Sequence, residues 1–522
     1  MKMKRVLIHC FVLAAIAYFN NLAFTQISSS ADFEDCTVGV ASGKATPDGR
    51  PLLWKTRDTS SINNGLRYNT SNKYKYIAVI TAGSSTAWMG VNEKGFSIMN
   101  SNSSDLESGS SGPGNGTVMS IALGSCATVA DFGHFLDSTN VTGRTTHANF
   151  GVIDSTGAAA IFETAGYEYW KFDANDSMTA PNGYVLRTNF AFKGAASGGI
   201  NPDIYSIERY LRQEQLMSDF YSGDSLTFKS ILRHQMRDFS DFNSQPVPVP
   251  FPQKWLSYRP YGYIYCDVSI CRTSSVSAVV FQGVLPQESA QLTTMWTILG
   301  QPASAIAVPY WPVGQVPNEA NGNSTAPLCN AALDIKQRLF DYEENTSYID
   351  SYKLLDGEGG GVWAKSFPAE DSIFAAAEQQ LTSWRSEGFE AADLVQTESE
   401  LAIYALNKLK YIYQGMVTKV DPLVAETIPE KFSLLQNYPN PFNASTTIQF
   451  ILPKSSFVQL KIYNTLGEEV GTVFARNFNS GRHSLHWHAD GLASGVYLFH
   501  LEAISSDDGN IFRQTRKLHL IK

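Results

Sequence analysis

The alternation of apolar and polar residues in the first part of the chain predicts three β-hairpins. In each of them, short extended runs flank a sequence with a strong turn preference. The turns are expected at residues 47–49, 92–95 and 154–157. The first hairpin begins at Cys36 and continues from Leu52. The N-terminal region is therefore expected to be rich in β-structure.

Helical spacing replaces this alternation further along the chain. Apolar residues recur every three or four positions in residues 202–220, 226–239 and 370–416. Between these runs, residues 266–284 return to a composition that is typical of strands. Strands followed by helices predict an α+β domain, which we place at residues 36–420.

The pattern changes again after this domain. A proline-containing stretch with little periodicity predicts a linker at residues 421–431. Short alternating runs follow at residues 458–463, 496–501 and 517–521. These runs predict a small all-β module at residues 432–522, built as an immunoglobulin-like sandwich.

The beginning of the chain predicts a secretory signal peptide. Three cationic side chains among the first five residues precede an apolar run at residues 6–19 that is too short to span a bilayer. Small residues at positions 23 and 25 place the cleavage site before Gln26, so the signal covers residues 1–25. No later segment reaches about 18 consecutive apolar residues, so we expect an exported protein without a transmembrane helix.

Composition limits the classes of function. A chain of 522 residues, 43% hydrophobic and 17% charged, has enough apolar side chains for two or three folded units. The net charge of -9 argues against nucleic-acid binding, because nucleic-acid-binding proteins concentrate Lys and Arg on one face. Once Cys10 has left with the signal, five cysteines remain, and this odd number predicts a free thiol or a pairing with another chain.

Cys36 is the candidate nucleophile. Amide cleavage needs a nucleophile, a base and donors for the oxyanion. A cysteine at a mature N-terminus supplies its thiol and, with an α-amino pKa of about 7.7 to 8.0, its own base, so no histidine is needed. Taken alone, Cys36 is also open to two other interpretations, namely a buried or disulfide-bonded residue and a lipid anchor. The acidic residues before it count against the anchor.

The neighbourhood of Cys36 resembles the choloylglycine hydrolase, penicillin acylase and acyl-coenzyme A:6-aminopenicillanic acid acyltransferase group of N-terminal-nucleophile enzymes. In that group a cysteine begins a strand, and Arg-x-x-Asp lies on the second strand of the hairpin. Here the sequence is KTRD, and the resemblance implies that Asp58 orients the α-amino group. Lys55 replaces the family's arginine, and Arg57 is expected on the same strand face. Either cation can stabilise the thiolate, and which of them does so stays open.

Three further segments match this group in the same order. VNEKGFSIMNSN resembles a hairpin that places an asparagine near the oxyanion, here Asn102 or, in another alignment, Asn100, and we prefer Asn102. LRTNF resembles a Thr-Asn motif whose asparagine donates its side-chain amide to the oxyanion, which implies this role for Asn189. SIERYLR resembles a segment with an arginine near the nucleophile, here Arg209, with Arg212 as the alternative.

The resemblance spans about residues 36–285 and implies a fold and an activity. The fold is a four-layer αββα arrangement. The activity is hydrolysis of a linear amide through an acyl-thioester, after autocatalytic cleavage of the Asp35–Cys36 bond removes a propeptide at residues 26–35. No cofactor or metal is implied. Acyl transfer, dipeptidase activity and a binding protein that lost the chemistry stay open, the last because of Lys55. The substrate also stays open, among bile-acid conjugates, penicillins, fatty acyl amides, lactone signals and small peptides.

The C-terminal module resembles the sorting domain of type IX secretion substrates in the Bacteroidota and their relatives. The match lies in NYPNPFNASTTIQFILP, LKIYNTLGEEV, GLASGVYLFHLEA and RKLHLIK. It implies the type IX secretion machinery as a partner, and passage through the periplasm of a Gram-negative bacterium to the cell surface or medium. His483, His486 and His488 lack a partner spaced for a metal site, so we expect solvent-facing strand residues. The oligomeric state stays open.

Overall fold

A computed structural model describes residues 34–193, 206–240, 263–340, 347–355, 361–418, 431–437, 440–443, 445–478, 481–489, 491–506 and 508–521. The predicted signal peptide, most of the propeptide and nearly all of the linker lie outside these residues. Among the described residues, no helix has the length and hydrophobicity needed to cross a membrane.

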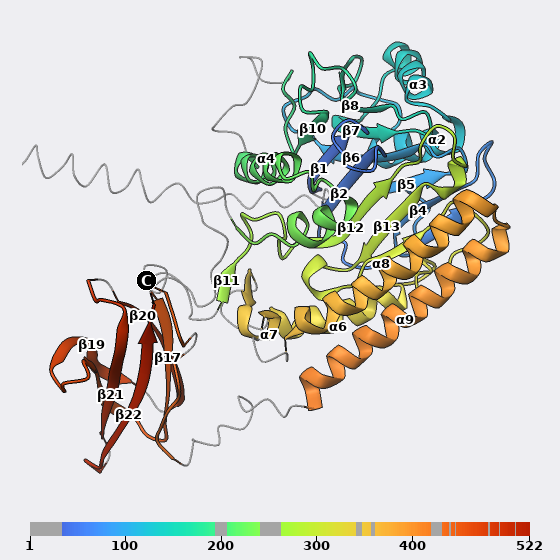
Figure 1. The fold of residues 1–522 in the computed structure, drawn as a ribbon. Coiled ribbons are helices and arrows are strands. Elements are labelled where there is room, and N and C mark those ends of the chain that lie inside the picture. Colours follow the sequence, from blue (N-terminus) through green and yellow to red (C-terminus); the bar gives the residue numbers. More distant parts are fainter. Residues whose placement is uncertain are drawn as a thin grey trace, which may run out of the picture. The chain divides into compact units, whose positions relative to one another are not determined.

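Two antiparallel β-sheets form the centre of the N-terminal domain (Figure 1). The six-stranded sheet has the order β10-β1-β2-β12-β13-β14. Its strands are β1 Asp35–Ala41, β2 Leu52–Asp58, β10 Tyr184–Arg187, β12 Ser275–Gln282, β13 Thr294–Leu299 and β14 Val308–Tyr310. The seven-stranded sheet follows chain order, with β3 Asn64–Asn69, β4 Tyr76–Thr81, β5 Met89–Asn92, β6 Ser97–Asn102, β7 Ala148–Ile153, β8 Ala159–Thr164 and β9 Tyr169–Asp173.

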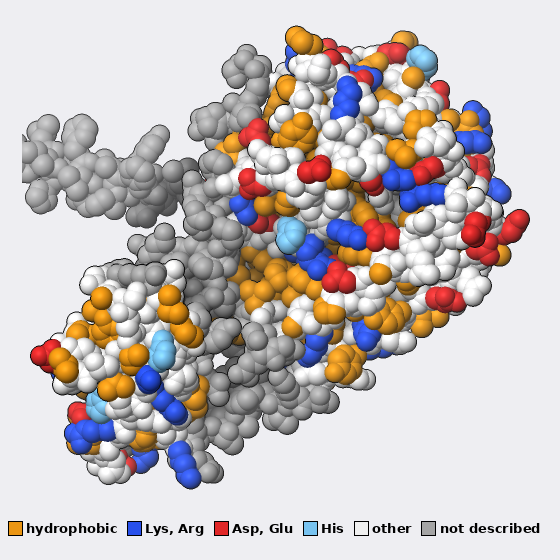
Figure 2. All heavy atoms as spheres, in the orientation of Figure 1, with side chains coloured by type: hydrophobic (Ala, Val, Ile, Leu, Met, Phe, Trp, Pro, Cys, Tyr) orange, Lys and Arg blue, Asp and Glu red, His pale blue; other side chains and the backbone are white. Residues whose placement is uncertain are grey.

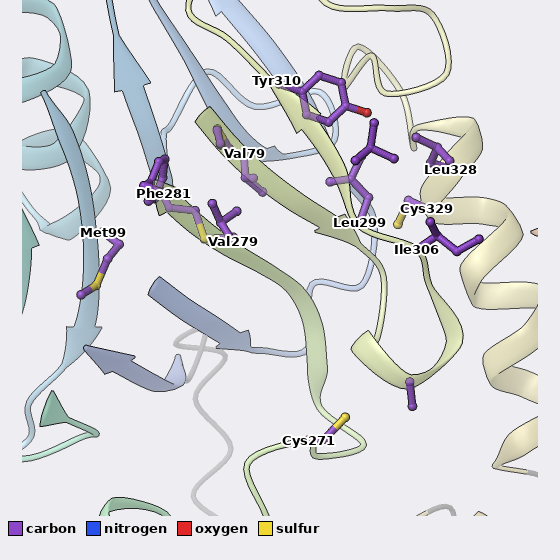
Figure 3. Packing of buried hydrophobic residues seen from close by; sticks show 14 of the residues in the cluster. Val79, Met99, Cys271, Val279, Phe281, Leu299, Ile306, Tyr310, Leu328 and Cys329 are labelled. Carbon is purple, nitrogen blue, oxygen red and sulfur yellow. The ribbon is translucent and has the colours of Figure 1, made fainter. Parts of the chain in front are cut away.

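The two sheets pack face to face. Strand β1 contacts β6, β7 and β8 of the other sheet, and β2 contacts β6 and β7. Val79 and Met99 of one sheet lie in one buried cluster with Val279 and Phe281 of the other (Figure 3). Because the side chains of a strand alternate between its faces, the same strands leave a second row of side chains for the outer layers.

Helices cover the outer faces of both sheets. On the seven-stranded sheet, α2 (Asn115–Ser125) and α3 (Val129–Thr142) share a buried cluster with strand residues. On the six-stranded sheet, α4 (Ile207–Ser222), α5 (Phe228–Ser230) and α8 (Val362–Glu387) do the same. The predicted four-layer αββα arrangement is thereby confirmed. The remaining elements are α6 Pro327–Leu339, α7 Ser351–Leu355, α9 Ala391–Thr418, β11 Tyr263–Tyr265 and β15 Tyr348–Asp350.

The three predicted hairpins are confirmed by the strand pairing. Strand β1 pairs with β2, β5 with β6 and β7 with β8. Gly95 and Gly157 adopt φ of +77° and +89° in two of the turns. Residues with a Cβ atom rarely adopt this conformation, which explains why glycine occupies both positions.

The structure differs from the sequence predictions more in the helices than in the hairpins. Helices α2 and α3 interrupt the β-rich region and were not predicted. The run at residues 226–239 is not one helix, because α5 is followed by a π-helical turn that ends at Gln235. There the Met236 amide donates to Ile231 O, and the Arg237 guanidinium donates to Leu232 O, so the side chain of Arg237 takes the place of a further helical amide.

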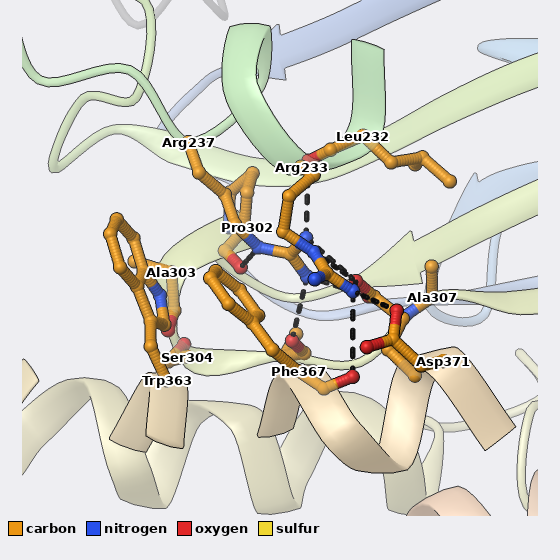
Figure 4. A network of polar contacts seen from close by, with 12 residues as sticks. Leu232, Arg233, Arg237, Pro302, Ala303, Ser304, Ala307, Trp363, Phe367 and Asp371 are labelled. Atoms are coloured by element: carbon orange, nitrogen blue, oxygen red, sulfur yellow. Dashed lines mark hydrogen bonds and ion pairs between the residues drawn. The ribbon is translucent and has the colours of Figure 1, made fainter. Parts of the chain in front are cut away.

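The helical run at residues 370–416 also divides, at Gly388 with φ +87°, into α8 and α9. A buried ion pair ties α8 to the six-stranded sheet. Glu370 accepts from Arg237 at 2.8 Å and from the amide of Ala307, just before β14, at 2.8 Å. Figure 4 shows this network, in which Arg237 also donates to Pro302 O. The outer helix layer is therefore fixed by polar contacts as well as by apolar packing.

The C-terminal module consists of strands in two antiparallel sheets. Their orders are β16-β17-β20 and β19-β18-β21-β22. The strands are β16 Ser433–Leu434, β17 Ser445–Leu452, β18 Ser456–Tyr463, β19 Glu469–Phe478, β20 Gly481–His488, β21 Gly495–Ser505 and β22 Ile511–Leu520. One hydrophobic cluster receives side chains from both sheets, as expected for a sandwich.

The structure also tests the predictions for the C-terminal histidines and for the cysteines. His483 is not a solvent-facing residue, because its ring is partly buried and lies 5.2 Å from that of Phe450 and 4.9 Å from that of Phe478. The odd cysteine count predicted a free thiol or a pairing with another chain, and all five cysteines after the predicted signal are free and buried. Figure 2 shows acidic and basic side chains interspersed over the face that it presents, unlike the basic face typical of nucleic-acid-binding proteins.

Candidate active site

Cys36 lies near the beginning of β1 and is completely buried. It stands opposite Arg57 in the pairing of β1 with β2. Burial raises the pKa of its thiol to about 12, although the positive charge of Lys55 opposes the shift. While residues 34 and 35 precede it, the thiol is therefore protonated near neutral pH and is a poor nucleophile.

Asn189 holds the main chain on both sides of the Asp35–Cys36 bond. Its Oδ1 accepts from the Cys36 amide at 3.0 Å. Its Nδ2 donates to Glu34 O at 3.0 Å and to Asn102 O at 3.1 Å. The side chain therefore presents an acceptor to the nitrogen of Cys36 and a donor to a carbonyl on the other side of the bond.

Arg209, at the start of α4, fixes this orientation of Asn189. Its Nη2 donates to Asn189 Oδ1 at 2.9 Å, and its Nη1 donates to Cys36 O at 3.0 Å and to Thr37 Oγ1 at 3.1 Å. Since an arginine has donors only, the oxygen of the Asn189 amide must face it. The alternative, Arg212, is instead paired with Asp238 at 2.7 Å.

The two carboxylate oxygens of Asp58 differ in their hydrogen bonding. Oδ1 accepts from Ser275 Oγ at 2.6 Å, whereas Oδ2 is buried and has no hydrogen-bond partner among the described residues. Burial raises the pKa of Asp58 to about 6, against the lowering effect of Arg272 and Arg209. In the pairing of β2 with β1, Asp58 lies opposite Asp35, the residue that directly precedes Cys36. A buried acceptor of this kind is suited to an ammonium group.

Lys55 and Arg57 lie on one strand face, as predicted, and both meet the carboxylate of Glu34. Arg57 Nε is 2.8 Å from Glu34 Oε1, and Lys55 Nζ is 3.9 Å from Glu34 Oε2. Lys55 also donates to Asn100 Oδ1 at 2.7 Å. Of the two candidate asparagines, Asn100 thus contacts a cation through its side chain, whereas Asn102 meets Asn189 through its main-chain carbonyl.

Sequence reasoning missed three residues of this cluster. Glu34 binds the two cations, Arg272 pairs with Asp35 at 2.9 Å, and Ser275 donates to Asp58. The acidic pair before Cys36 was visible and can be interpreted as a ligand for nearby cations. Arg272 lies in the loop before β12, and Ser275 is the first residue of that strand. No local sequence pattern marks either residue as part of the cluster.

Comparison with protein families supports both resemblances. Residues 45–248 match the family described as acyl-coenzyme A:6-aminopenicillanic acid acyl-transferase. Residues 436–510 match the secretion system C-terminal sorting domain. The resemblance of the chain to the N-terminal-nucleophile group, fused to a sorting domain, is thereby confirmed. The first match contains Asp58, Asn189 and Arg209, but it begins after Cys36.

Several solved structures are similar to about half of this chain. A mutant of conjugated bile acid hydrolase from Clostridium perfringens has 12% identity and a TM-score of 0.31, with 51% of this chain and 89% of that chain covered. Penicillin V acylase from Agrobacterium tumefaciens has 11% identity and a TM-score of 0.30, with 53% and 85% covered. The Caenorhabditis elegans N-acylethanolamine-hydrolyzing acid amidase ortholog has 13% identity and a TM-score of 0.29, with 50% and 99% covered. No curated protein sequence matches the chain.

Proposed function

We propose that this chain is the precursor of an exported cysteine amidohydrolase that cleaves a linear amide bond. The main support is the set of contacts around the nitrogen of Cys36. That nitrogen is bound by Asn189 Oδ1, which Arg209 orients. On the neighbouring strand, Asp58 Oδ2 has no hydrogen-bond partner in the part of the chain that the structure describes. If Cys36 becomes the first residue, these two acceptors are suited to hold its α-amino group.

Autocatalytic cleavage would provide that amino group. The Cys36 thiol attacks the carbonyl carbon of Asp35, so that a C–S bond forms, the C–N bond breaks and the thiol proton passes to the nitrogen. Water then hydrolyses the thioester, which releases the propeptide and restores the thiol. Removal of Glu34 with the propeptide would also remove a negative charge that, besides burial, raises the pKa of the thiol.

The mature enzyme would repeat this chemistry on an external amide. The α-amino group takes the thiol proton and returns it to the leaving amine. Asn189 Nδ2, which loses Glu34 O on processing, becomes available to the oxyanion. The thioester is then hydrolysed by water. The family match keeps acyl transfer as the second candidate, in which an amine replaces that water.

The state of the mature wild-type protein tests this proposal. We expect intact mass and N-terminal sequencing to place the first residue at Cys36, and iodoacetamide to modify one thiol per chain rapidly near neutral pH. Burial raises the pKa of the thiols of Cys126, Cys266, Cys271 and Cys329, so these should react only after denaturation. A different mature N-terminus, or a fast thiol at another cysteine, would argue against the proposal.

The sorting domain supports export, and we propose the type IX machinery as the route. Deleting residues 432–522 should leave the N-terminal domain folded and processed, because the module has a hydrophobic cluster of its own. The truncated protein should then accumulate in the periplasm of the native host. Fractionation of cells and medium measures this, with full-length Cys36→Ala as a control that should be secreted although inactive. Normal secretion of the truncated protein would exclude the sorting role.

A further inference from the structure

Glu34 is buried and is bound by two cations and an amide donor, as an anionic ligand would be. Its side chain is only 6% exposed, and its carboxylate lies 2.8 Å from Arg57 Nε and 3.9 Å from Lys55 Nζ. Its main-chain oxygen accepts from Asn189 Nδ2 at 3.0 Å. The residue two positions before Cys36 is therefore bound through both its side chain and its main chain by residues of the N-terminal domain.

The two cations are held in place by neutral partners. Arg57 is 1% exposed, donates to Asn64 Oδ1 at 2.8 Å and lies 4.5 Å from the centre of the Trp88 ring. Lys55 is fully buried and donates to Asn100 Oδ1 at 2.7 Å. None of these partners precedes Cys36, so this cationic site, defined by Lys55 and Arg57, persists when the propeptide is removed.

Removal of the propeptide leaves this site without its anion. Among the described residues, every ion pair of Lys55 and Arg57 is made with Glu34. A buried charge that loses its partner is strongly unfavourable, and an anionic ligand of matching shape relieves that cost. Arginine is well suited to this, because its fork of donors matches a carboxylate.

We propose that the mature enzyme binds a carboxylate of its substrate at Lys55 and Arg57, in the place of Glu34. Its substrates are then amides whose acyl portion carries a carboxylate at about one residue's distance from the reacting carbonyl. The acyl side is indicated because Glu34 lies on the acyl side of the Asp35–Cys36 bond, whose carbonyl Cys36 attacks. The inference rests on the proposed function and adds the substrate class to it.

Matched chromogenic substrates test this inference on the processed protein. They are N-acyl 4-nitroanilides whose acyl chain, from glutaryl to suberyl, ends in a carboxylate, each compared with its methyl ester. Because a hydrogen bond to a charged group contributes about 1.5 to 3 kcal/mol, kcat/KM for the best acid should exceed that for its ester about tenfold or more. Arg57→Gln should bring this ratio close to one. Arg67→Gln, which changes a partly exposed arginine on β3, should leave it as in wild type.

A second measurement does not depend on the Arg57 variant being processed. On the wild-type enzyme, the free diacids should inhibit turnover at concentrations at least tenfold lower than monoacids of the same length. Either of two results overturns this inference alone. One is turnover of the esters without preference for the acids, and the other is equal inhibition by the diacids and the monoacids. A processed protein that hydrolyses neither acids nor esters overturns the proposed function, and this inference with it.

Discussion

Cys36→Ala is expected to abolish amide hydrolysis and to leave residues 26–35 attached after the signal peptide is removed. One thiol is proposed to act first on the Asp35 carbonyl and later on the substrate. Alanine provides neither the nucleophile nor the proton that must pass to the leaving nitrogen. Removing the nucleophile of a serine protease triad lowers kcat by about 10⁶-fold, and we expect a loss of similar order here. Activity should therefore fall below detection, and intact mass should show the unprocessed chain.

The folded state of this variant makes the test specific. Cys36 is fully buried, so replacement by the smaller alanine removes a single sulfur from a packed site and should preserve the fold. Cys126→Ala provides a matched control, because this buried thiol belongs to the α2 and α3 layer and not to the candidate site. The control should be processed and active. A Cys36→Ala protein trimmed to residue 36 and fully active would refute the assignment of the nucleophile.

The processed and unprocessed states differ in ways that one cluster of residues explains. Before cleavage, the thiol of Cys36 is buried with a pKa raised to about 12, and Glu34 occupies the cationic site. Both features suppress reaction with an external amide. Cleavage would release Glu34 from the cationic site, and with it a negative charge that contributes to the raised pKa of the thiol. On the proposed function, the propeptide would thus block the substrate site of the enzyme until the Asp35–Cys36 bond is cleaved.

The sequence predicted those parts of the site that depend on local geometry. The positions of Lys55, Arg57 and Asp58 relative to Cys36 follow from a hairpin whose turn is marked by proline and glycine, and alternation along a strand then sets the face of each side chain. The strand positions needed no knowledge of distant packing. Asn189, 153 residues from Cys36, was predicted from a family motif and not from local geometry.

The remaining parts depend on contacts between distant segments. Arg272 is more than two hundred residues from Asp35, and their ion pair forms only when β12 joins β2. Helix α2 was missed because its start carries neither a capping side chain nor an acidic residue in the first turn. The π-helical turn after α5 ends at Gln235, and Arg237, two residues later, forms an ion pair with Glu370 of α8. The local periodicity does not reveal this partner.

Asn189→Ala is expected to lower kcat of the processed enzyme by about 10² to 10³-fold with KM little changed, as for the loss of one oxyanion donor. In the unprocessed chain, Asn189 Nδ2 already donates to a carbonyl oxygen, that of Glu34, at 3.0 Å. After cleavage the same donor, held in place by Arg209 through Oδ1, is free to meet the negative charge that appears only in the tetrahedral intermediate. Its loss should therefore affect the rate more than binding.

The same substitution should retain part of the processing and the alkylation of Cys36, because the thiol and the α-amino group remain. Asn182→Ala, at an exposed position just before β10, is the matched control and should behave as wild type. Steady-state kinetics on a substrate that wild type turns over separates kcat from KM. If kcat stays within about threefold while KM rises, Asn189 contributes to binding and not to the intermediate, because an oxyanion donor acts on kcat. The donor must then be sought at Asn100, whose Nδ2 is buried without a hydrogen-bond partner among the described residues.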